Sequence, residues 1–388
     1  MILSMIERAT SRLCNVLFCL FWLMPLWGIS QTPDDVSIKS LKFINEYDIQ
    51  FNVKFKETTV GGLSGIDYDK KNNIYYFISD DRSAINPARF YTAKIKISEK
   101  GIDTVQFSDV KFLRQQNGET FPSAKQDLSH TIDPEAIRFN PTTNQIIWTS
   151  EGERMPKSSP PVLINPSINI SDLDGKFVGI FSAPSNLTMQ LTENGPHQNG
   201  ALEGVTFDPD FKKMYVAMEE PLYEDGPLAD IGPTNSLTRI LGYDVATKKN
   251  FAQYAYALEQ VARPANSPTA FKINGVSEIL SLGNKKLLTV ERSFSTGNLA
   301  CTIKVFLSDL GQATPVEDTK SMKETPPEHL VSKKLLLNMD DLGIFIDNIE
   351  GVSFGPELPN GHKTLLFVSD NNFVLLEKMQ LLLFEVIP

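Results

Sequence analysis

The chain has 388 residues, of which 41% are hydrophobic and 22% are charged. This composition is that of a folded protein with a buried core, and it excludes disordered, collagen-like and coiled-coil chains. The net charge is −10 at pH 7, with few basic runs. Nucleic acid or an anionic membrane surface is therefore not expected to be the main partner.

The N-terminal segment has the features of a secretory signal peptide. Arg8 and Arg12 precede an apolar run over residues 13–27, and small residues follow at 28 and 30. The run is shorter than the roughly 20 residues that span a bilayer, which argues against a membrane anchor. We therefore predict a signal peptide over residues 1–30, cleavage after Ser30, and export to the periplasm or the extracellular space.

Five segments then repeat one pattern of a short strand, a turn rich in Asp, Asn, Pro, Gly and Lys, and a second strand that ends at an acidic residue. The first polar residues of the repeats are 68 to 75 positions apart: Ser64, Glu135, Glu203, Glu278 and Glu350. This period suits a four-stranded propeller blade. We predict an all-β protein, a single five-bladed β-propeller over residues 31–388. A sixth blade is the alternative if one interval hides an extra sheet.

The remaining strands of each blade follow the hairpins. Third strands are expected at 89–97, 177–182, 239–243, 302–307 and 380–386. Fourth strands are expected at 105–113, 251–258 and 335–337, with a weaker candidate at 186–191. The last repeat has no fourth strand of its own, and residues 38–49 can supply one. The N-terminal strand would then complete the last blade and leave the ring without exposed edges.

The first strand of a propeller blade lines the central channel, so the aligned serine and glutamates should face one axis. Carboxylates in a confined channel repel one another and stay ionised only beside a cation. Oxygen ligands without His or Cys suit Ca²⁺ better than Zn²⁺. The predicted calcium ligands are Ser64, Glu135, Glu203, Glu278 and Glu350. The alternative is that these residues only bond backbone groups where blades meet.

The second strand of each hairpin returns to the end of the channel where the first strand began. The acids that close it should therefore share the channel mouth with the ring, beside long Pro-rich loops over residues 155–166 and 221–234. The predicted substrate-binding residues on this rim are Arg82, Arg154, Arg292, Glu151 and Asp370. The residues predicted to orient an attacking water are Asp81 and Glu220. The alternative for each arginine, Arg239 included, is an ion pair that ties blades together.

Two histidines, His130 and His197, lie in loops that lead to the same rim. A general acid or base role is one interpretation, and a solvated or capping role is the other. The sequence contains no GxSxG elbow, P-loop or zinc motif, which argues against serine-hydrolase chemistry.

The repeated motifs, in this order, resemble the phytase-like family with esterase-like activity, a group of exported bacterial proteins. The matching stretches include GGLSGIDYD with FISDDR, DPEAIRF with TSEGE, LEGVTFDPD with AMEEPLYEDG, GVSEIL with LLTVERSF, and DNIEGVSFGPELPNG with LLFVSDNNF. The resemblance implies a phosphoric-ester hydrolase. The first-blade segment LSGIDYDKKNNIYYFISDDR is also similar to calcium-activated apyrases, which implies a central calcium ion.

Three functions are compatible with these observations. They are a calcium-dependent phosphoester hydrolase acting on a small anionic, phosphorylated substrate, a non-catalytic ligand-binding propeller, and a structural module of an exported assembly. Acids beside arginines on one rim favour the first. We expect a monomer that binds no nucleic acid and has no stable membrane insertion after signal cleavage.

Overall fold

The computed structural model describes residues 35–388. The predicted signal peptide and its cleavage site at Ser30 lie outside the described residues. Within the described range, no helix combines the length and the apolar character needed to cross a membrane. Strands and their connecting loops make up nearly all of this range, as expected for an all-β protein.

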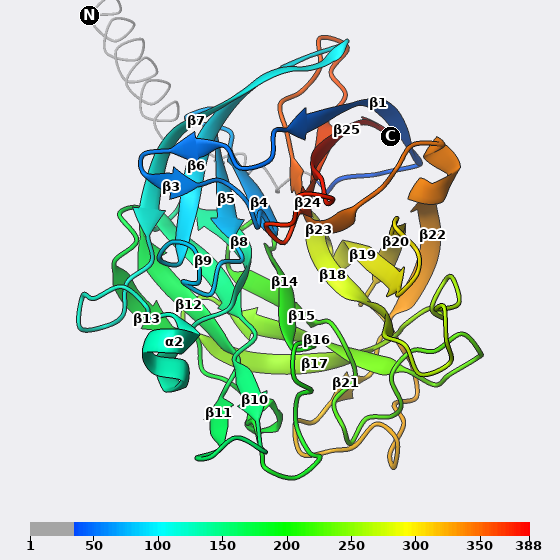
Figure 1. The fold of residues 1–388 in the computed structure, drawn as a ribbon. Coiled ribbons are helices and arrows are strands. Elements are labelled where there is room, and N and C mark those ends of the chain that lie inside the picture. Colours follow the sequence, from blue (N-terminus) through cyan, green and yellow to red (C-terminus); the bar gives the residue numbers. More distant parts are fainter. Residues whose placement is uncertain (1–34) are drawn as a thin grey trace, which may run out of the picture. The chain divides into compact units, whose positions relative to one another are not determined.

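Five antiparallel sheets are arranged in a ring around one axis, that of the predicted channel (Figure 1). The innermost strands of the five blades are β4 (Gly65–Asp69), β8 (Pro134–Asn140), β14 (Leu202–Phe207), β18 (Lys272–Gly283) and β23 (Asn348–Phe354). Each inner strand contacts the next, and β23 contacts β4. The predicted five-bladed propeller is therefore confirmed, and the six-bladed alternative is wrong.

Three blades have the strands expected from the sequence. Blade 1 adds β5 (Ile74–Ser79), β6 (Arg89–Ser98) and β7 (Gly101–Phe112) to β4. Blade 3 adds β15 (Lys213–Met218), β16 (Leu237–Asp244), β17 (Lys249–Ala257) and a short fifth strand, β21 (Pro315–Val316), to β14. Blade 4 adds β19 (Lys286–Ser295), β20 (Thr302–Asp309) and β22 (Ser332–Asn338) to β18.

Blade 2 differs from the expectation in its outer half. Its order is β8, β9 (Gln145–Ser150), β12 (Ser167–Asp172) and β13 (Phe177–Ile180). The segment predicted as the third strand, 177–182, thus contains the fourth, and the strand predicted at 186–191 is wrong because this segment overlaps a 3₁₀ turn, η3 (Ser185–Leu187). An inserted hairpin of β10 (Glu153–Met155) and β11 (Val162–Ile164) separates the second and third strands.

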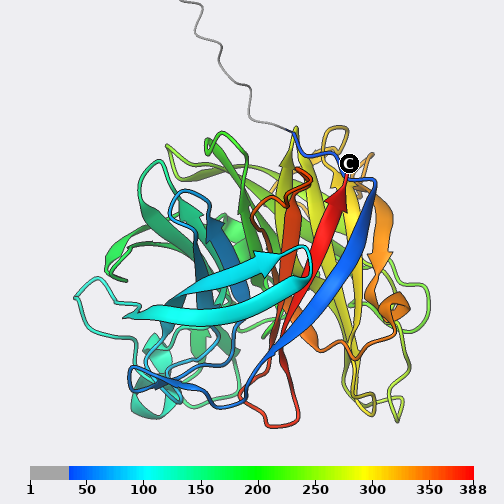
Figure 2. The ribbon, with the colours of Figure 1, turned by 90° about the horizontal axis from the view of Figure 1, so that it is seen from above.

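Blade 5 contains both ends of the described chain. Its order is β23, β24 (Thr364–Asp370), β25 (Met379–Ile387) and β1 (Ser40–Ile49). The outer strand β1 pairs antiparallel with β25, from Ser40 opposite Ile387 to Ile49 opposite Met379. Figure 2 shows the blue β1 beside the red β25. The predicted closure of the ring by the N-terminal strand is confirmed.

The apolar core lies between neighbouring sheets. Leu366 and Val368 of β24, for example, share one buried cluster with Ile66 of β4 and Phe77 of β5. Because this packing between sheets provides the core, the channel itself is free to hold polar side chains.

The remaining short elements lie in connecting loops: β2 (Lys54–Phe55), β3 (Thr58–Thr59), α2 (Ala124–Asp127), η2 (Leu128–His130) and η4 (Met339–Leu342). The loops after the second strands, together with the entries to the inner strands, gather at one end of the channel because the strands alternate in direction. This end carries the candidate site.

Candidate functional site

A buried arginine lies among the inner strands of the ring. Arg138 projects from β8, and its Nη1 donates to the carbonyl oxygen of Ile66 at 2.7 Å. Its Nη2 donates to the carbonyl oxygens of Ile279 and Val352, both at 3.1 Å. The same nitrogen lies 2.8 Å from Oε2 of Glu278. Arg138 therefore joins inner strands of blades 1, 2, 4 and 5.

Two of the predicted calcium ligands are occupied by protein partners. Besides pairing with Arg138, Glu278 accepts hydrogen bonds at Oε1 from the amides of Val205 and Ile279, at 3.1 and 2.9 Å. Burial raises the pKa of Glu278 to about 7 despite the opposing effect of Arg138. Ser64 donates its hydroxyl to the carbonyl oxygen of Glu135 at 2.6 Å. Both residues bond groups where blades meet, as in the alternative raised from the sequence.

The backbone of the inner strands is irregular where the aligned glutamates occur. The pairing register with the second strand shifts between Pro134 and Ile137, Leu202 and Val205, Val276 and Glu278, and Ile349 and Gly351. A bulge of this kind redirects side chains at a sheet edge. Close packing between blades explains the glycine after Glu203, because a Cβ on Gly204 would lie 2.6 Å from the amide nitrogen of Ile279 in the next blade.

The end of the channel where the inner strands begin holds a cluster of carboxyl groups that we call the acidic mouth. Its members come from the starts of inner strands or from the ends of second strands. They are Asp80, Asp133, Glu135, Glu151, Glu203, Glu219, Glu220, Glu350 and Asp370. All except Asp80 are at least nine-tenths buried.

Two overlapping groups within the acidic mouth have the spacing of a metal site. Carboxylate oxygens of Asp80, Asp133 and Glu135 lie within 4.8 Å of one another, and so do those of Glu135, Glu151 and Glu203. Oε1 of Glu151 accepts a hydrogen bond from the amide of Ala201 at 2.5 Å, whereas its buried Oε2 has no hydrogen-bond partner. Such an orphaned, buried oxygen fits a hard cation.

Burial raises the pKa of every carboxyl group in the acidic mouth. For Asp80 and Glu135 the repulsion of neighbouring acids adds to the effect of burial, and their pKa lies well above the ordinary value. The pKa reaches about 8 for Glu220 and Glu350 and about 7 for Asp370. Without added positive charge, part of this cluster is therefore protonated near neutral pH.

Arg292 from β19 faces the acidic mouth. Its Nη2 lies 2.5 Å from Oε1 of Glu219, and its Nε lies 3.8 Å from Oε1 of Glu350 and has no hydrogen-bond partner. Although burial opposes its charge, these two acids raise the pKa of Arg292. Its side chain is 13% exposed, and it lines the cavity at the mouth. Of the three predicted arginines, this one lies where an anion can reach it.

The other two predicted arginines are engaged by the protein. Arg82 pairs with Glu153, and its Nε lies 3.5 Å from Oδ2 of Asp133, so it ties blade 1 to blade 2. Arg154 donates to the carbonyl oxygens of Gln190 and Thr192 at 3.0 and 2.9 Å. The guanidinium of Arg154 also lies over the ring of Tyr223, at 4.8 Å from its centre.

The two residues predicted to orient water have different surroundings. Asp81 accepts hydrogen bonds from the amides of residues 84, 85 and 86, at 2.7, 3.1 and 2.9 Å, and pairs with Arg89 at 2.7 Å. Both of its oxygens are therefore used by a loop of blade 1. Glu220 lies in the acidic mouth, where burial and the charge of Glu219 raise its pKa.

Other residues that the repeats place near the rim, among them Glu291, the acid that closes the second strand of the fourth repeat, lie either at the mouth or at a blade junction. Asp370 accepts a hydrogen bond from the amide of Asn372 at 2.8 Å and stays at the mouth. Glu291 instead accepts from the hydroxyl of Tyr256 and from Lys333, at 2.8 and 2.6 Å, between blades 3 and 4. Arg239 forms a fully buried pair with Asp225.

Neither histidine singled out in the sequence lines the cavity at the mouth. His130 is exposed and lies 2.8 Å from Oδ2 of Asp127. His197 stacks on Tyr223, with ring centres 3.6 Å apart. Burial, assisted by Arg154, lowers the pKa of His197 to about 4, so its ring is neutral at pH 7.

Sequence reasoning missed two members of the first acidic group as candidate ligands. In the sequence Asp80 is one of the acids that close a second strand, without being a predicted ligand, and Asp133 has no predicted role. The signal for Asp133 is its position two residues before Glu135, because alternate residues of an extended segment point to the same side.

The acidic mouth opens into a cavity of about 300 Å³. Asp80, Glu135, Glu203, Glu350 and Arg292 form its polar wall, while Phe271, Phe294 and Leu299 form an apolar wall. The cavity thus combines the carboxylates with one cationic side chain and a hydrophobic surface.

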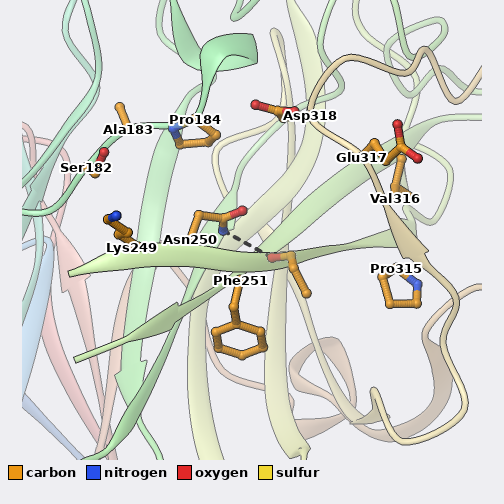
Figure 3. A pocket seen from close by; sticks show the side chains of 11 residues that line it. Ser182, Ala183, Pro184, Lys249, Asn250, Phe251, Pro315, Val316, Glu317 and Asp318 are labelled. Atoms are coloured by element: carbon orange, nitrogen blue, oxygen red, sulfur yellow. Dashed lines mark hydrogen bonds between the residues drawn. The ribbon is translucent and has the colours of Figure 1, made fainter. Parts of the chain in front are cut away.

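A larger hollow, of about 480 Å³, lies on the outer side of blade 3 beside β17 and β21 (Figure 3). Lys249, Phe251, Glu317 and Asp318 are among its lining residues. Among the residues that the structure describes, acids spaced for a metal ion occur at the channel mouth alone, so we take the acidic mouth as the candidate site.

Comparison with solved structures finds propeller proteins of low sequence identity. The α-L-arabinofuranosidase from Lactobacillus brevis is 11% identical, with a TM-score of 0.42, over 84% of this chain and 91% of that chain. The periplasmic gluconolactonase PpgL from Pseudomonas aeruginosa is 10% identical, with a TM-score of 0.34, over 85% and 90%. These scores are too low to carry an argument about function. No curated protein matches the chain.

The family comparison covers most of the chain. A family model described as phytase-like, esterase-like activity of phytase, matches residues 58–373, a range that includes the inner strands of all five blades. The family expected from the repeated motifs is thus confirmed, and the chain belongs to the phytase-like family.

Proposed function

We propose that the protein is an exported, calcium-dependent hydrolase that cleaves a phosphate ester of a small anionic substrate at the acidic mouth. The observation that carries this proposal is the pair of overlapping carboxylate groups, of which Asp80, Glu135 and Glu203 line the cavity. Family membership supports hydrolase activity in general. The phosphate ester, the calcium ion and export are our own inferences.

The residues of the acidic mouth fit a hard divalent cation. We assign Glu135, Glu151 and Glu203 as its ligands, with Asp80 and Asp133 as the ligands of the overlapping group. All are oxygen donors, which Ca²⁺ prefers. Burial raises the pKa of Glu135 and Glu203, and a bound cation would offset the mutual repulsion that adds to this effect. Ser64 and Glu278 are left out of this assignment because protein groups already occupy them.

The chain's own residues supply the other parts of the reaction. Bound Ca²⁺ would polarise the phosphoryl group and offset its charge. Arg292, which lines the cavity beside the carboxylates, is assigned to a phosphoryl oxygen. Glu220 is assigned to orient the attacking water, because its carboxyl group belongs to the acidic mouth, where burial and the charge of Glu219 raise its pKa. Asp81 is not retained, since four hydrogen bonds occupy its carboxylate.

The ion is tested by thermal unfolding. We expect Ca²⁺ to raise the melting temperature of the wild type and EDTA to lower it, because an ion that binds only the folded state stabilises it by mass action. Glu203→Gln should weaken this response. Glu328→Gln, at an exposed site, is the matched control and should respond as the wild type does. An identical response of wild type and Glu203→Gln would refute the ion site.

The reaction is tested with a panel of phosphomonoesters, with and without Ca²⁺. We expect Arg292→Lys to reduce the rate by on the order of 10²-fold, because the variant keeps the charge but loses the second donor to a phosphoryl oxygen. Circular dichroism checks that the variant is folded. If the wild type hydrolyses no phosphoester with Ca²⁺ present, a non-catalytic ligand-binding propeller becomes the better account.

A further inference from the structure

We propose that the substrate cleaved at the acidic mouth carries an apolar alkyl or aryl group next to a single phosphate. This inference rests on the proposed function and names the substrate class of the same site. It is carried by the apolar wall of the cavity, by the ordered loops that hold this wall, and by the charge balance of the mouth.

The apolar wall consists of three side chains from blade 4 and its loops. Phe271 is 61% exposed and Leu299 is 86% exposed, and both line the same cavity as Arg292. Phe294, from β19, lies behind Phe271 with ring centres 6.3 Å apart. Clusters of solvent-exposed apolar side chains beside a polar site are typical of a ligand-binding surface.

The backbone holds this wall in place before any ligand binds. The amide of Thr296 donates to the carbonyl oxygen of Phe271 at 2.9 Å. In the turn before Leu299, the amide of Asn298 donates to the carbonyl oxygen of Ser295 at 3.1 Å, and its side chain donates to Pro264 at 3.1 Å. A wall ordered in this way binds an apolar group at a lower entropic cost.

The loop between β24 and β25 lies beside the cavity and exposes two leucines. Asn372 and Glu377 line the cavity and are joined by a hydrogen bond of 2.9 Å between their side chains. Between them the chain exposes Leu375 and Leu376, which are 72% and 84% exposed. The segment with these exposed leucines thus begins and ends at residues that line the cavity.

The charge balance disfavours a substrate with many phosphates. Nine carboxyl groups lie in the acidic mouth, and the nearby arginines, Arg82 and Arg292, are already paired with acids. One calcium ion and Arg292, the one arginine among the described residues that line the cavity, can offset a single phosphate. Each further phosphate would face carboxylates with no cation left to pair with it.

The test compares substrates with matched leaving groups. Ethyl phosphate and hexyl phosphate both release an alkoxide, so their difference in kcat/KM reports on the alkyl chain. We expect hexyl phosphate to be preferred by about tenfold or more, as burial of several CH₂ groups predicts. Phe271→Ser should remove most of this preference. Phe251→Ser, an exposed phenylalanine on blade 3 outside the mouth (Figure 3), is the control.

The corresponding phosphonates have a C–P bond in place of the hydrolysable ester bond. Their binding therefore tests the apolar subsite separately from the proposed reaction. Calorimetry in Ca²⁺ should show hexylphosphonate binding about tenfold more tightly than ethylphosphonate, with the difference lost in Phe271→Ser. This result without any hydrolysis would uphold the apolar subsite and reject the proposed reaction. Hydrolysis or binding that is indifferent to chain length would overturn the apolar subsite.

Discussion

Asp81 and Asp225 occupy equivalent positions in blades 1 and 3. Each lies in the loop after a second strand and pairs with a buried arginine of the third strand, Arg89 or Arg239. Each also accepts hydrogen bonds from backbone amides, such as that of Met322 at 2.9 Å for Asp225. An acid in this position holds a loop, although it lies close in sequence to acids that face the channel.

Removing the charge of Asp81 should therefore affect stability. We expect Asp81→Asn to lower the free energy of unfolding by about 3–5 kcal/mol, because the guanidinium of Arg89 would stay buried without its counter-charge. Urea denaturation measures this loss, and Asp225→Asn should behave in the same way. A variant with wild-type stability and no activity would instead support the catalytic role first predicted for Asp81.

The raised pKa values of the acidic mouth predict how stability depends on pH in the absence of metal. Burial raises the pKa of Glu220 and Glu350 from 4.5 to about 8, so the folded state binds more protons than the unfolded state between these values. The free energy of unfolding in EDTA should fall as the pH rises from about 5 to about 8. Denaturation at several pH values measures this slope. Saturating Ca²⁺ should reduce it, and a stability that rises with pH in EDTA would contradict the assignment.

For single residues, the sequence predicted the place along the channel better than it predicted the side chains that each residue contacts. The repeat alignment brought Glu135 and Glu203 to one end of the channel, where they lie in a group with Glu151. It could not separate Glu278 from them, because its partner Arg138 belongs to another blade and lies 140 positions away in the chain. Such a pairing depends on the way the blades meet, which no single repeat encodes.

The inner strands are held together by one side chain as well as by packing. Arg138 on β8 reaches carbonyl oxygens of β4, β18 and β23, and its charge is balanced by Glu278. A guanidinium suits this position because its donors form a rigid planar fork that can bond several acceptors at once. The strand periods of the sequence predicted where these strands lie, and the arginine that links them was not recognised.

Replacement of Arg138 should separate this contribution from packing. We expect Arg138→Met to lower the free energy of unfolding by about 3–5 kcal/mol, since Glu278 would remain buried with no opposite charge. The double variant Arg138→Met, Glu278→Gln should recover part of the loss, because no buried charge is then left unpaired. Urea denaturation of the single and double variants gives this comparison. Equal stability of Arg138→Met and wild type would show that the inner strands do not depend on Arg138.

Strand prediction failed where polar residues are buried in a strand. The third strand of blade 2, β12, contains Asn169 and Ser171, and both are buried. Ser171 accepts a hydrogen bond from the indole nitrogen of Trp148 at 3.0 Å, which satisfies the hydroxyl inside the sheet. In the sequence, the segment that forms β12 contains several polar residues. The hydrogen-bond partner that allows Ser171 to be buried there comes from the neighbouring strand β9.

The ring as a whole is closed by residues from the two ends of the described chain. The constant spacing of the repeats predicted this closure, because the last unit is completed only by the N-terminal strand. Lys378 reinforces it by pairing with Glu46 and Asp48 of β1, at 3.0 and 2.8 Å. Closure leaves blade 5 with β1 as its outer strand and keeps the edge of β25 from being exposed.

Deletion of residues 38–49 should therefore destabilise the whole propeller. The deletion removes Ile38 and Ile49, each worth about 1.5–3 kcal/mol when buried, and exposes the backbone edge of β25. We expect a lower melting temperature and a tendency to associate. A synthetic peptide of residues 36–49 should restore the melting temperature by pairing with β25, whereas a scrambled peptide should not. A truncated protein that melts like the wild type, or that gains nothing from the peptide, would mean that the ring holds together without its N-terminal strand.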